Sequence, residues 1–220
     1  MTIKELTLTN CGECVSAVQT LRGEVDPTDA YSQHNLCDYT GDDPLRVMNA
    51  RKEFCRLMDI DPGRLVMPRQ RHTTHVAVID NDFIHAPAEL KEHLLDGIDA
   101  LVTDVPEVCI GVNTADCVPI VFADPVAGIV AVAHAGWRGT VGRIAAGTVQ
   151  AMKLMGAHVK HISAAMGASI CANCFEVGDE VPLAFVEAGF DLDRIMHRNP
   201  ATGKAHIDLQ EANRLTLIRS

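Results

Sequence analysis

The sequence lacks an excess of positive charge. It contains 19 lysines and arginines against 29 aspartates and glutamates, which gives a formal net charge of −10 at pH 7. A nucleic-acid partner or an anionic membrane surface requires a basic face, and no stretch of the sequence supplies one. We therefore expect neither nucleic acid nor a membrane as a partner, and we expect any phosphate-bearing ligand to be held by a local site.

Long apolar runs and a targeting segment are also absent. No apolar run reaches the ~18 residues of a transmembrane helix. The first residues, MTIKELTLTN, have neither the basic n-region nor the apolar h-region of a secretory signal, which predicts a cytoplasmic protein. There is no internal repeat or linker either, so the 220 residues, 47% of them hydrophobic, predict one domain over 1–220 with a buried core.

The eight cysteines do not indicate a disulfide-rich secreted domain, because the chain has no signal peptide and is long enough to fold around a core. Two pairs have CxxC spacing, Cys11 with Cys14 and Cys171 with Cys174. Together they could form a structural zinc site with four thiolates, but only if the two ends of the chain met. We favour independent thiols over such a site.

Short segments rich in β-branched residues and bounded by Asp, Gly or Pro predict strands. They are HVAVID (75–80), DALVTD (99–104), CIGVNT (109–114), CVPIVFAD (117–124), GIVAVAHA (128–135) and HISAAMG (161–167). Helical periodicity predicts helices over 44–60 and over 140–156, the second with Thr140 as its N-cap and Gly156 as its stop.

Toward the C-terminus, a loop leads into a helix over 175–190, and a strand leads into a helix over 204–218. Because strands and helices mix without regular βαβ alternation, the sequence predicts an α+β fold of layered mixed β-sheets flanked by helices. The irregular stretch 21–44 predicts a long loop that is functional or mobile.

Three stretches place chemically active side chains at predicted strand ends. They are RQRHTTHV (69–76), NTADCVPI (113–120) and AHAGWRGT (133–140). A hairpin that turns at residues 124–125 would bring Cys117 and His134 to one end. Two imidazoles and one thiolate are a ligand set for zinc with the fourth position open. Either His72 or His75 could supply the other imidazole, since residues three apart on a strand face opposite sides, and spacing alone does not choose between them.

Other interpretations of the same positions remain open. A cysteine in an apolar strand is normally a small buried hydrophobe, so Cys117 could be one, and Trp137, the only tryptophan, could fill the core. Gly136, Arg138 and Gly139 lead into a helix N-terminus, where an anion is favoured and an arginine can grip phosphate. An ordinary strand-to-helix turn with a solvated arginine fits these residues equally well. The P-loop pattern GxxxxGK[ST] is absent.

At these stretches the chain resembles the YfiH-type family, once labelled multicopper polyphenol oxidases or laccases and now understood as purine nucleoside phosphorylases with adenosine deaminase activity. The motifs that carry the resemblance are QRHT with His72, TADCVP with Cys117, HAGWRG with His134, and GASI followed by CFEVGDEV at 167–181. The resemblance covers most of the chain from the loop NLCDYTGDDP (35–44) onward. It implies that His72, not His75, joins Cys117 and His134 as a zinc ligand.

The resemblance also implies α/β/β/α layers and cleavage of purine nucleosides by phosphate, with Gly136, Arg138 and Gly139 contributing to the phosphate and nucleoside pocket. The chain departs from the family pattern at Thr73, where the family has glycine, and at Ala168, where it has proline. It stops at LTLIRS, whereas the family usually continues into a segment with a Cys-Thr pair and an F-S-x-R-R stretch. Either this sequence is a piece of a longer chain or this member lacks part of the family's substrate site.

Zinc is expected rather than copper. A multicopper cluster needs many imidazoles, typically in H-x-H pairs, and the ten histidines of this chain form no such pair. A blue-copper site also uses two histidines and a cysteine, but it adds a weak axial methionine. That methionine usually shares a short loop with the cysteine and one histidine, and no methionine lies near Cys117 or His134 in the sequence.

The sequence thus predicts a zinc-dependent purine nucleoside phosphorylase for adenosine, inosine or guanosine that also deaminates adenosine. Cys117 and His134 would belong to the catalytic centre, the metal would activate water for attack on C6 of adenine, and the nearby Asp116 would move protons. One alternative is a metal-free hydrolase or deamidase with Cys117 as nucleophile and His134 as base. Another is a non-enzymatic metal- or redox-binding protein, which the CxxC pairs favour.

Overall fold

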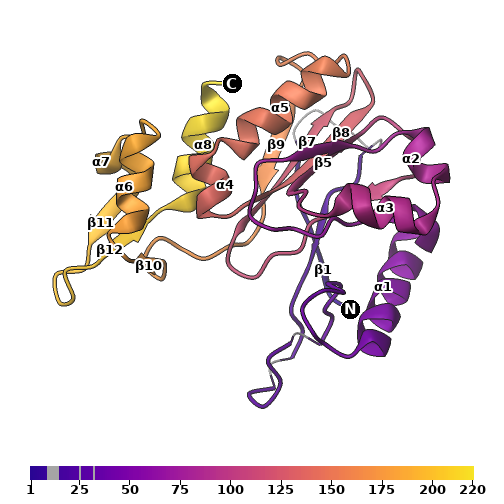
Figure 1. The fold of residues 1–220 in the computed structure, drawn as a ribbon, viewed down its shortest axis with the longest axis horizontal. Helices are drawn as coiled ribbons and strands as arrows, with labels where there is room; N and C mark the ends of the chain where they lie inside the picture. The colour runs from indigo at the N-terminus through magenta and orange to yellow at the C-terminus, as the bar shows by residue number, and fades with distance from the viewer. Residues whose placement is uncertain (9–14, 25, 32) are drawn as a thin grey trace.

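The computed structural model describes residues 1–8, 15–24, 26–31 and 33–220. A mixed sheet at its centre consists of β4 (Val76–Val78), β5 (Ala100–Thr103), β7 (Val118–Asp124), β8 (Ile129–Ala135) and β9 (Ser163–Met166). Its spatial order is β4-β5-β8-β7-β9 (Figure 1). β4 and β5 are parallel and the other neighbours are antiparallel, as expected for the mixed sheet that the sequence predicts.

The hairpin of β7 and β8 shows how both faces of this sheet are buried. Ile120 and Phe122 lie on the face that packs against α5 (Ile144–Leu154). Val121 and Val132 belong to a second apolar cluster on the opposite face. Because both faces are covered, the sequences of the two strands are nearly continuous apolar runs and do not alternate between apolar and polar residues.

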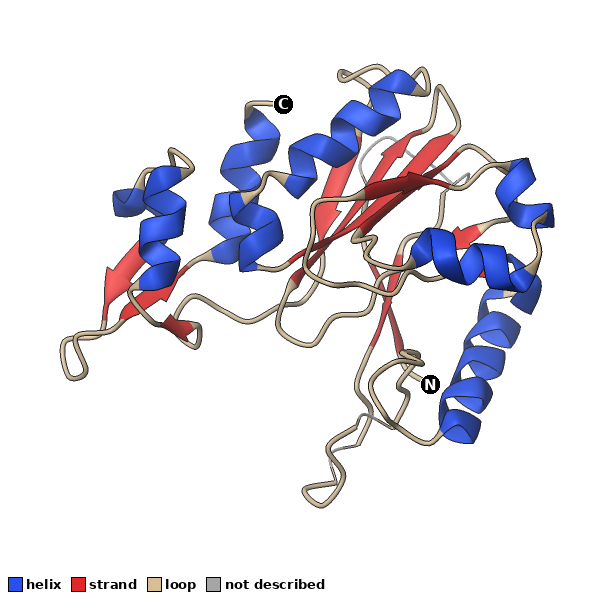
Figure 2. Ribbon diagram, viewed as in Figure 1, coloured by secondary structure: helices blue, strands red, loops and turns tan. Residues whose placement is uncertain are grey.

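Smaller strands and a long helix cover the second face of the sheet. They are β1 (Ile3–Glu5) antiparallel to β2 (Val18–Thr20), β3 (Leu65–Val66) parallel to β6 (Cys109–Ile110), and α1 (Pro44–Met58). Phe54 and Cys55 of α1 pack against Leu65 and Cys109 of the β3–β6 pair. The α5 helix, the central sheet, the smaller strands and α1 therefore form the α/β/β/α layers that the family resemblance implies (Figure 2).

Four short helical segments were not predicted, and one of them, α7 (Leu192–Ile195), lies in the C-terminal part of the chain. η1 (Pro62–Arg64) precedes β3, and α2 (Asn81–His85) and α3 (Ala88–Leu95) follow β4. Asp80 caps α2 by accepting a hydrogen bond from the Phe83 N–H at 2.8 Å. These segments are too short to show a clear apolar periodicity, which is why the sequence pattern missed them.

The C-terminal residues form a smaller antiparallel sheet at one end of the molecule (Figure 1). Its elements are β10 (Glu176–Val177), α6 (Glu180–Glu187), α7 (Leu192–Ile195), β11 (Met196–Arg198), β12 (Ala205–Ile207) and α8 (Leu209–Ile218). Phe185 of α6 and Leu215 of α8 join the same buried cluster as Phe122 of the central sheet. This continuity supports one domain over 1–220, which stays a prediction.

The helix predicted over 140–156 is in fact two helices. α4 (Trp137–Val141) ends before Arg143, whose left-handed φ of 63° separates it from α5. The Arg143 guanidinium lies 3.7 Å from the centre of the Phe190 ring, so a tertiary contact holds this bend. Thr140 consequently lies inside α4, and its prediction as an N-cap was wrong.

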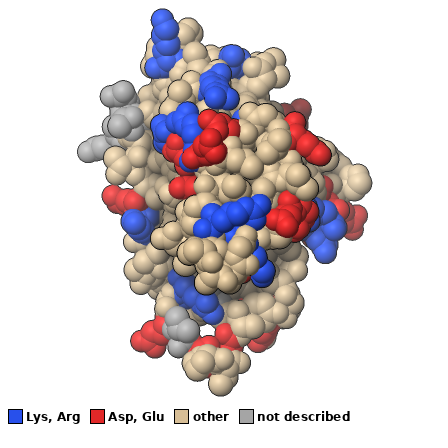
Figure 3. Space-filling model, turned by 90° about the vertical axis from the view of Figure 1, so that its left-hand side faces the viewer, with Lys and Arg blue, Asp and Glu red and all other residues tan. Residues whose placement is uncertain are grey.

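The surface agrees with the expectation of no broad basic field on the face shown in Figure 3, where acidic and basic side chains are interspersed. Within the described ranges, no helix combines the length and the apolar character needed to cross a bilayer. Cys11 and Cys14 lie outside the described residues, and the zinc site suggested for the two CxxC pairs therefore stays a prediction.

Candidate metal centre

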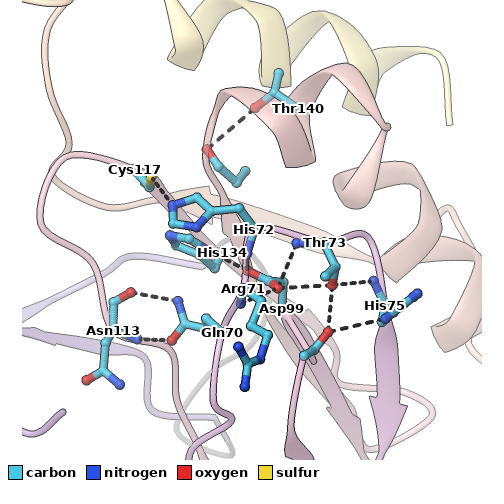
Figure 4. Close-up of polar contacts among 12 residues, drawn as sticks. Gln70, Arg71, His72, Thr73, His75, Asp99, Asn113, Cys117, His134 and Thr140 are labelled. Carbon is cyan, nitrogen blue, oxygen red and sulfur yellow. Dashed lines mark hydrogen bonds and ion pairs between the residues drawn. The ribbon is translucent and has the colours of Figure 1, made fainter. Parts of the chain in front are cut away.

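His72, Cys117 and His134 come together at one end of the central sheet (Figure 4). Their donor atoms all lie within 4.8 Å of one another. The Cys117 Sγ is 3.8 Å from the His72 Nε2, and the two imidazole rings meet edge to face with centroids 4.9 Å apart. In the part of the chain that the structure describes, this is the only group of three or more such side chains that could hold a metal ion.

The β7–β8 hairpin positions two of the three donors, as the sequence predicts. Its register pairs Pro119 with His134 and Val118 with Ala135. Cys117 immediately precedes β7, so it lies diagonally across from His134 on the same face. Diagonal neighbours of this kind are close enough for their side chains to meet.

His72 comes from the loop before β4, and its backbone has a left-handed φ of 58°. This strained conformation turns the imidazole toward Cys117. His75 takes no part in the group, since its ring nitrogen Nδ1 lies 3.3 Å from the Gly97 carbonyl. The spacing of the two histidines left the choice open, and the structure brings only His72 to the other donors.

Asp99 organises the site from beneath and was not singled out from the sequence. It is fully buried, and its carboxylate accepts a hydrogen bond from the His134 Nδ1 at 2.8 Å. The same carboxylate accepts the backbone N–H groups of Arg71, His72 and Thr73 at 2.9–3.0 Å. One acidic residue thereby holds both the His72 loop and the His134 ring.

The bond to Asp99 also determines which nitrogen of His134 is available. Because a carboxylate can only accept, the proton of a neutral His134 lies on Nδ1 and the Nε2 lone pair is free for a metal ion. The one sequence signal for this role was weak, a single aspartate directly before the apolar strand β5.

The electrostatics of the three groups follow from burial and from these bonds. Burial alone would raise the pKa of Asp99, but the hydrogen bonds from His134 and the loop outweigh it and lower the pKa to about 2. Burial alone would lower the pKa of His134, but Asp99 and Cys117 outweigh it and raise the pKa to about 9. Burial and the nearby His134 lower the pKa of His72. A metal ion must therefore displace a proton from His134, and its affinity should rise with pH.

Gly136 has no side chain, and the donor residues occupy the space beside it. A Cβ at this position would lie 2.8 Å from the Cys117 Sγ and 2.9 Å from the His72 Cδ2. No side chain can be placed there without moving a donor. Packing of the metal donors therefore requires a glycine at position 136, two residues after His134.

The other predicted site residues lie around this centre. Asp116 is exposed and borders the same cavity. Arg138 is exposed on α4, with its guanidinium 4.3 Å from the centre of the Trp137 ring, and its charge contributes to the lowered pKa of His72. Gly139 is buried inside α4, where a Cβ would lie 3.3 Å from Ile144.

The metal centre opens onto a large cavity. Its volume is about 1310 Å³, and all three donors line it. Described residues of the stretch 21–44 form part of its wall, with Asn35 and Tyr39 among the lining residues. Gln70 joins two sides of the cavity, because its amide exchanges hydrogen bonds of 2.7 and 2.8 Å with the backbone of Asn113.

Fold and site together define an α+β protein with a His–Cys–His group that could bind a metal ion. A family model described as multi-copper polyphenol oxidoreductase laccase matches residues 16–220. The chain belongs to this family.

Named relatives and solved structures agree with this assignment. Adenosine deaminase RL5 from an unknown prokaryotic organism is 56% identical over 216 residues, which cover 98% of this chain and 82% of that protein. A purine nucleoside phosphorylase from Bacteroides thetaiotaomicron is 40% identical over 189 residues, 86% of this chain and 70% of the relative. The crystal structure of Bacillus licheniformis YfiH has a TM-score of 0.79 at 27% identity, with 99% of this chain and 77% of that chain covered. The resemblance to YfiH-type proteins is confirmed.

Proposed function

We propose that this chain is a zinc-dependent enzyme that cleaves purine nucleosides with phosphate and also deaminates adenosine. The observation that carries the proposal is the convergence of His72, Cys117 and His134 within 4.8 Å on the wall of a cavity of about 1310 Å³. The relatives support it, because one is named an adenosine deaminase and another a purine nucleoside phosphorylase. Purine nucleosides and phosphate are the partners that we propose.

The donor set fits zinc. Two imidazole nitrogens and one thiolate are common zinc ligands, and three protein ligands leave the fourth position for a substrate or water. Asp99 fixes the orientation of His134, as carboxylates behind metal-bound histidines do. When bound, zinc would supply a Lewis acid that polarises a substrate atom and lowers the pKa of a coordinated water.

The remaining roles rest on the positions of the chain's own residues. Asp116 borders the cavity next to Cys117, so we propose that its carboxylate holds and releases a proton beside the substrate. Arg138 is the cation that we propose for phosphate, because its guanidinium is exposed and acts electrostatically on His72. Gly136 and Gly139 would contribute through their backbone and through the space that they leave.

The test is an assay of metal-replete protein with inosine, guanosine and adenosine, each with and without phosphate. We expect phosphate-dependent release of the purine base from nucleosides and release of ammonia from adenosine. If the zinc-loaded protein forms neither product, the proposal is wrong. His72→Ala should lose zinc and both activities, whereas His75→Ala, the matched control three residues away, should keep them.

The same protein separates this proposal from a metal-free cysteine hydrolase. A zinc-bound Cys117 thiolate should resist alkylation until a chelator is added. A free nucleophile activated by His134 would instead react at once, and the chelator would change nothing. Mass spectrometry of the peptide that contains Cys117 distinguishes the two outcomes.

A further inference from the structure

Cys171 and Cys174 form a pair of thiols that the proposed function leaves without a role. Both side chains are exposed, and both are free cysteines in the structure. They lie in the segment between β9 and β10, apart from the His72–Cys117–His134 group. The CxxC spacing that the sequence analysis noted therefore corresponds to an accessible pair at the surface.

The backbone between the two cysteines forms one tight turn. The N–H groups of Cys174 and Phe175 both donate to the Cys171 carbonyl, at 3.0 and 3.1 Å. A turn closed in this way brings its end Cα atoms within about 7 Å, and disulfides usually span Cα separations of roughly 4.4–6.8 Å. A disulfide can therefore form here without unfolding the turn.

Neighbouring residues hold the turn on both sides. The Ile170 N–H donates to the carbonyl of Asp116 at 2.9 Å, and the buried His206 donates from Nδ1 to the Ala172 carbonyl at 3.2 Å. These bonds keep the two thiols together at the surface. Because the turn is already ordered, formation of the disulfide requires little further loss of backbone conformational entropy.

The environments of the two thiols differ. Hydrogen bonds from the Cys174 thiol and from the Cys174 backbone N–H lower the pKa of Cys171. The same contact with Cys171 raises the pKa of Cys174. A thiolate is the reactive form of cysteine, so the lowered pKa of Cys171 favours Cys171 as the attacking residue and Cys174 as the resolving one.

A metal site is the competing use of such a pair, and the described residues do not favour it. Two thiolates need at least one more ligand to form a zinc site. Over the described ranges, only His72, Cys117 and His134 form a group of three or more possible ligands, so no third donor completes the Cys171–Cys174 pair.

We propose that Cys171 and Cys174 are a thiol–disulfide exchange site that reacts with low-molecular-weight disulfides. The Cys171 thiolate attacks one sulfur of the disulfide, whose S–S bond breaks and releases one thiolate. Cys174 then loses its proton to solvent and attacks the Cys171 sulfur, which releases the second thiolate. The protein dithiol is oxidised to a disulfide, and the small disulfide is reduced to two thiols. Because the ring spans only four residues and is exposed, a dithiol reductant should reverse the reaction.

The experiment treats the full-length, zinc-loaded protein with glutathione disulfide, quenches it with an alkylating agent and digests it with trypsin. Cleavage after Lys160 and Arg194 releases the peptide 161–194, which contains Cys171 and Cys174 and no other cysteine. We expect this peptide to lose the mass of two hydrogen atoms and to escape alkylation. Treatment with dithiothreitol should restore the mass of the reduced peptide and the alkylation of both thiols. The buried Cys55 is the internal control and should stay reduced.

Two single variants test the assigned roles. Cys174→Ser should stop at the first step and accumulate one glutathione on Cys171. Cys171→Ser should carry at most one glutathione, on Cys174, and should form no disulfide within the peptide 161–194. If the wild-type peptide 161–194 keeps both thiols alkylatable after glutathione disulfide, the proposal is wrong. Protection of both thiols without oxidation, removed by a chelator, would show a metal site and would also overturn it.

Discussion

Replacement of Asp99 by asparagine is the sharpest test of how the metal centre is organised. One carboxylate oxygen accepts the His72 N–H and the His134 Nδ1, and the other accepts the N–H groups of Arg71 and Thr73. An asparagine amide keeps only one acceptor oxygen, so its NH₂ group faces either the Arg71 and Thr73 N–H groups or the His72 N–H and the His134 Nδ1, which can accept only if the His134 proton moves to Nε2. The variant therefore loses two hydrogen bonds to a charged group and places donors against donors.

The size of the effect follows from this count. Hydrogen bonds to charged groups contribute about 1.5–3 kcal/mol each, so two of them amount to about 3–6 kcal/mol of unfolding free energy. A domain whose stability exceeds about 6 kcal/mol, within the ordinary range of about 5–15 kcal/mol, would stay folded in weakened form. Loss of a partner behind a metal-binding histidine typically costs about 10–100-fold in metal affinity, and we expect the same for Asp99→Asn.

The assay is zinc competition with a chromophoric chelator, combined with urea unfolding in the presence of EDTA to measure the apoprotein. Asp96→Asn is the matched control, because Asp96 is exposed and contacts the Arg71 side chain at 2.9 Å. A surface pair of this kind contributes little to stability because solvent screens it, and its loss should leave zinc affinity unchanged. A folded Asp99→Asn variant with wild-type zinc affinity would refute the assignment of Asp99 as the organiser of His134.

Three further changes test the packing and the electrostatics. Gly136→Ala should weaken zinc binding by about 10-fold or more in the same competition assay, because its Cβ would lie 2.8 Å from the Cys117 Sγ. Gly147→Ala, in α5 with nothing within 4 Å of its Cβ, should instead raise the free energy of unfolding by about 1 kcal/mol and leave zinc affinity unchanged. Asp124 is buried, and although burial alone would raise its pKa, bonds from the His158 N–H and two turn N–H groups lower it. Its carboxylate therefore stabilises the fold above about pH 4 and loses this effect as the pH falls through the lower folded-state pKa. Asp124→Asn should cost about 1–3 kcal/mol at pH 7 in urea unfolding, and the cost should shrink at acid pH. A cost that stays constant down to pH 2 would contradict that account.

Local sequence patterns predicted the regular elements well where the segments are long. The strand runs around β7 and β8 and the helix at 44–60 were recognised, since apolar periodicity and turn residues act over a few neighbours. Gly156, with a left-handed φ of 110°, follows α5 as predicted. The break between α4 and α5 was missed, because the contact of Arg143 with Phe190 that holds it joins residues far apart in the sequence.

For the site, the sequence by itself determined that Cys117 and His134 would meet, because a hairpin carries its own register once the turn is set. It also determined, through Gly136, that space would remain beside them. Only the tertiary structure decided that His72 and not His75 joins the pair, and that the buried Asp99 holds them. Both depend on hydrogen bonds between a loop and a strand that are distant along the chain, and no local pattern encodes such bonds.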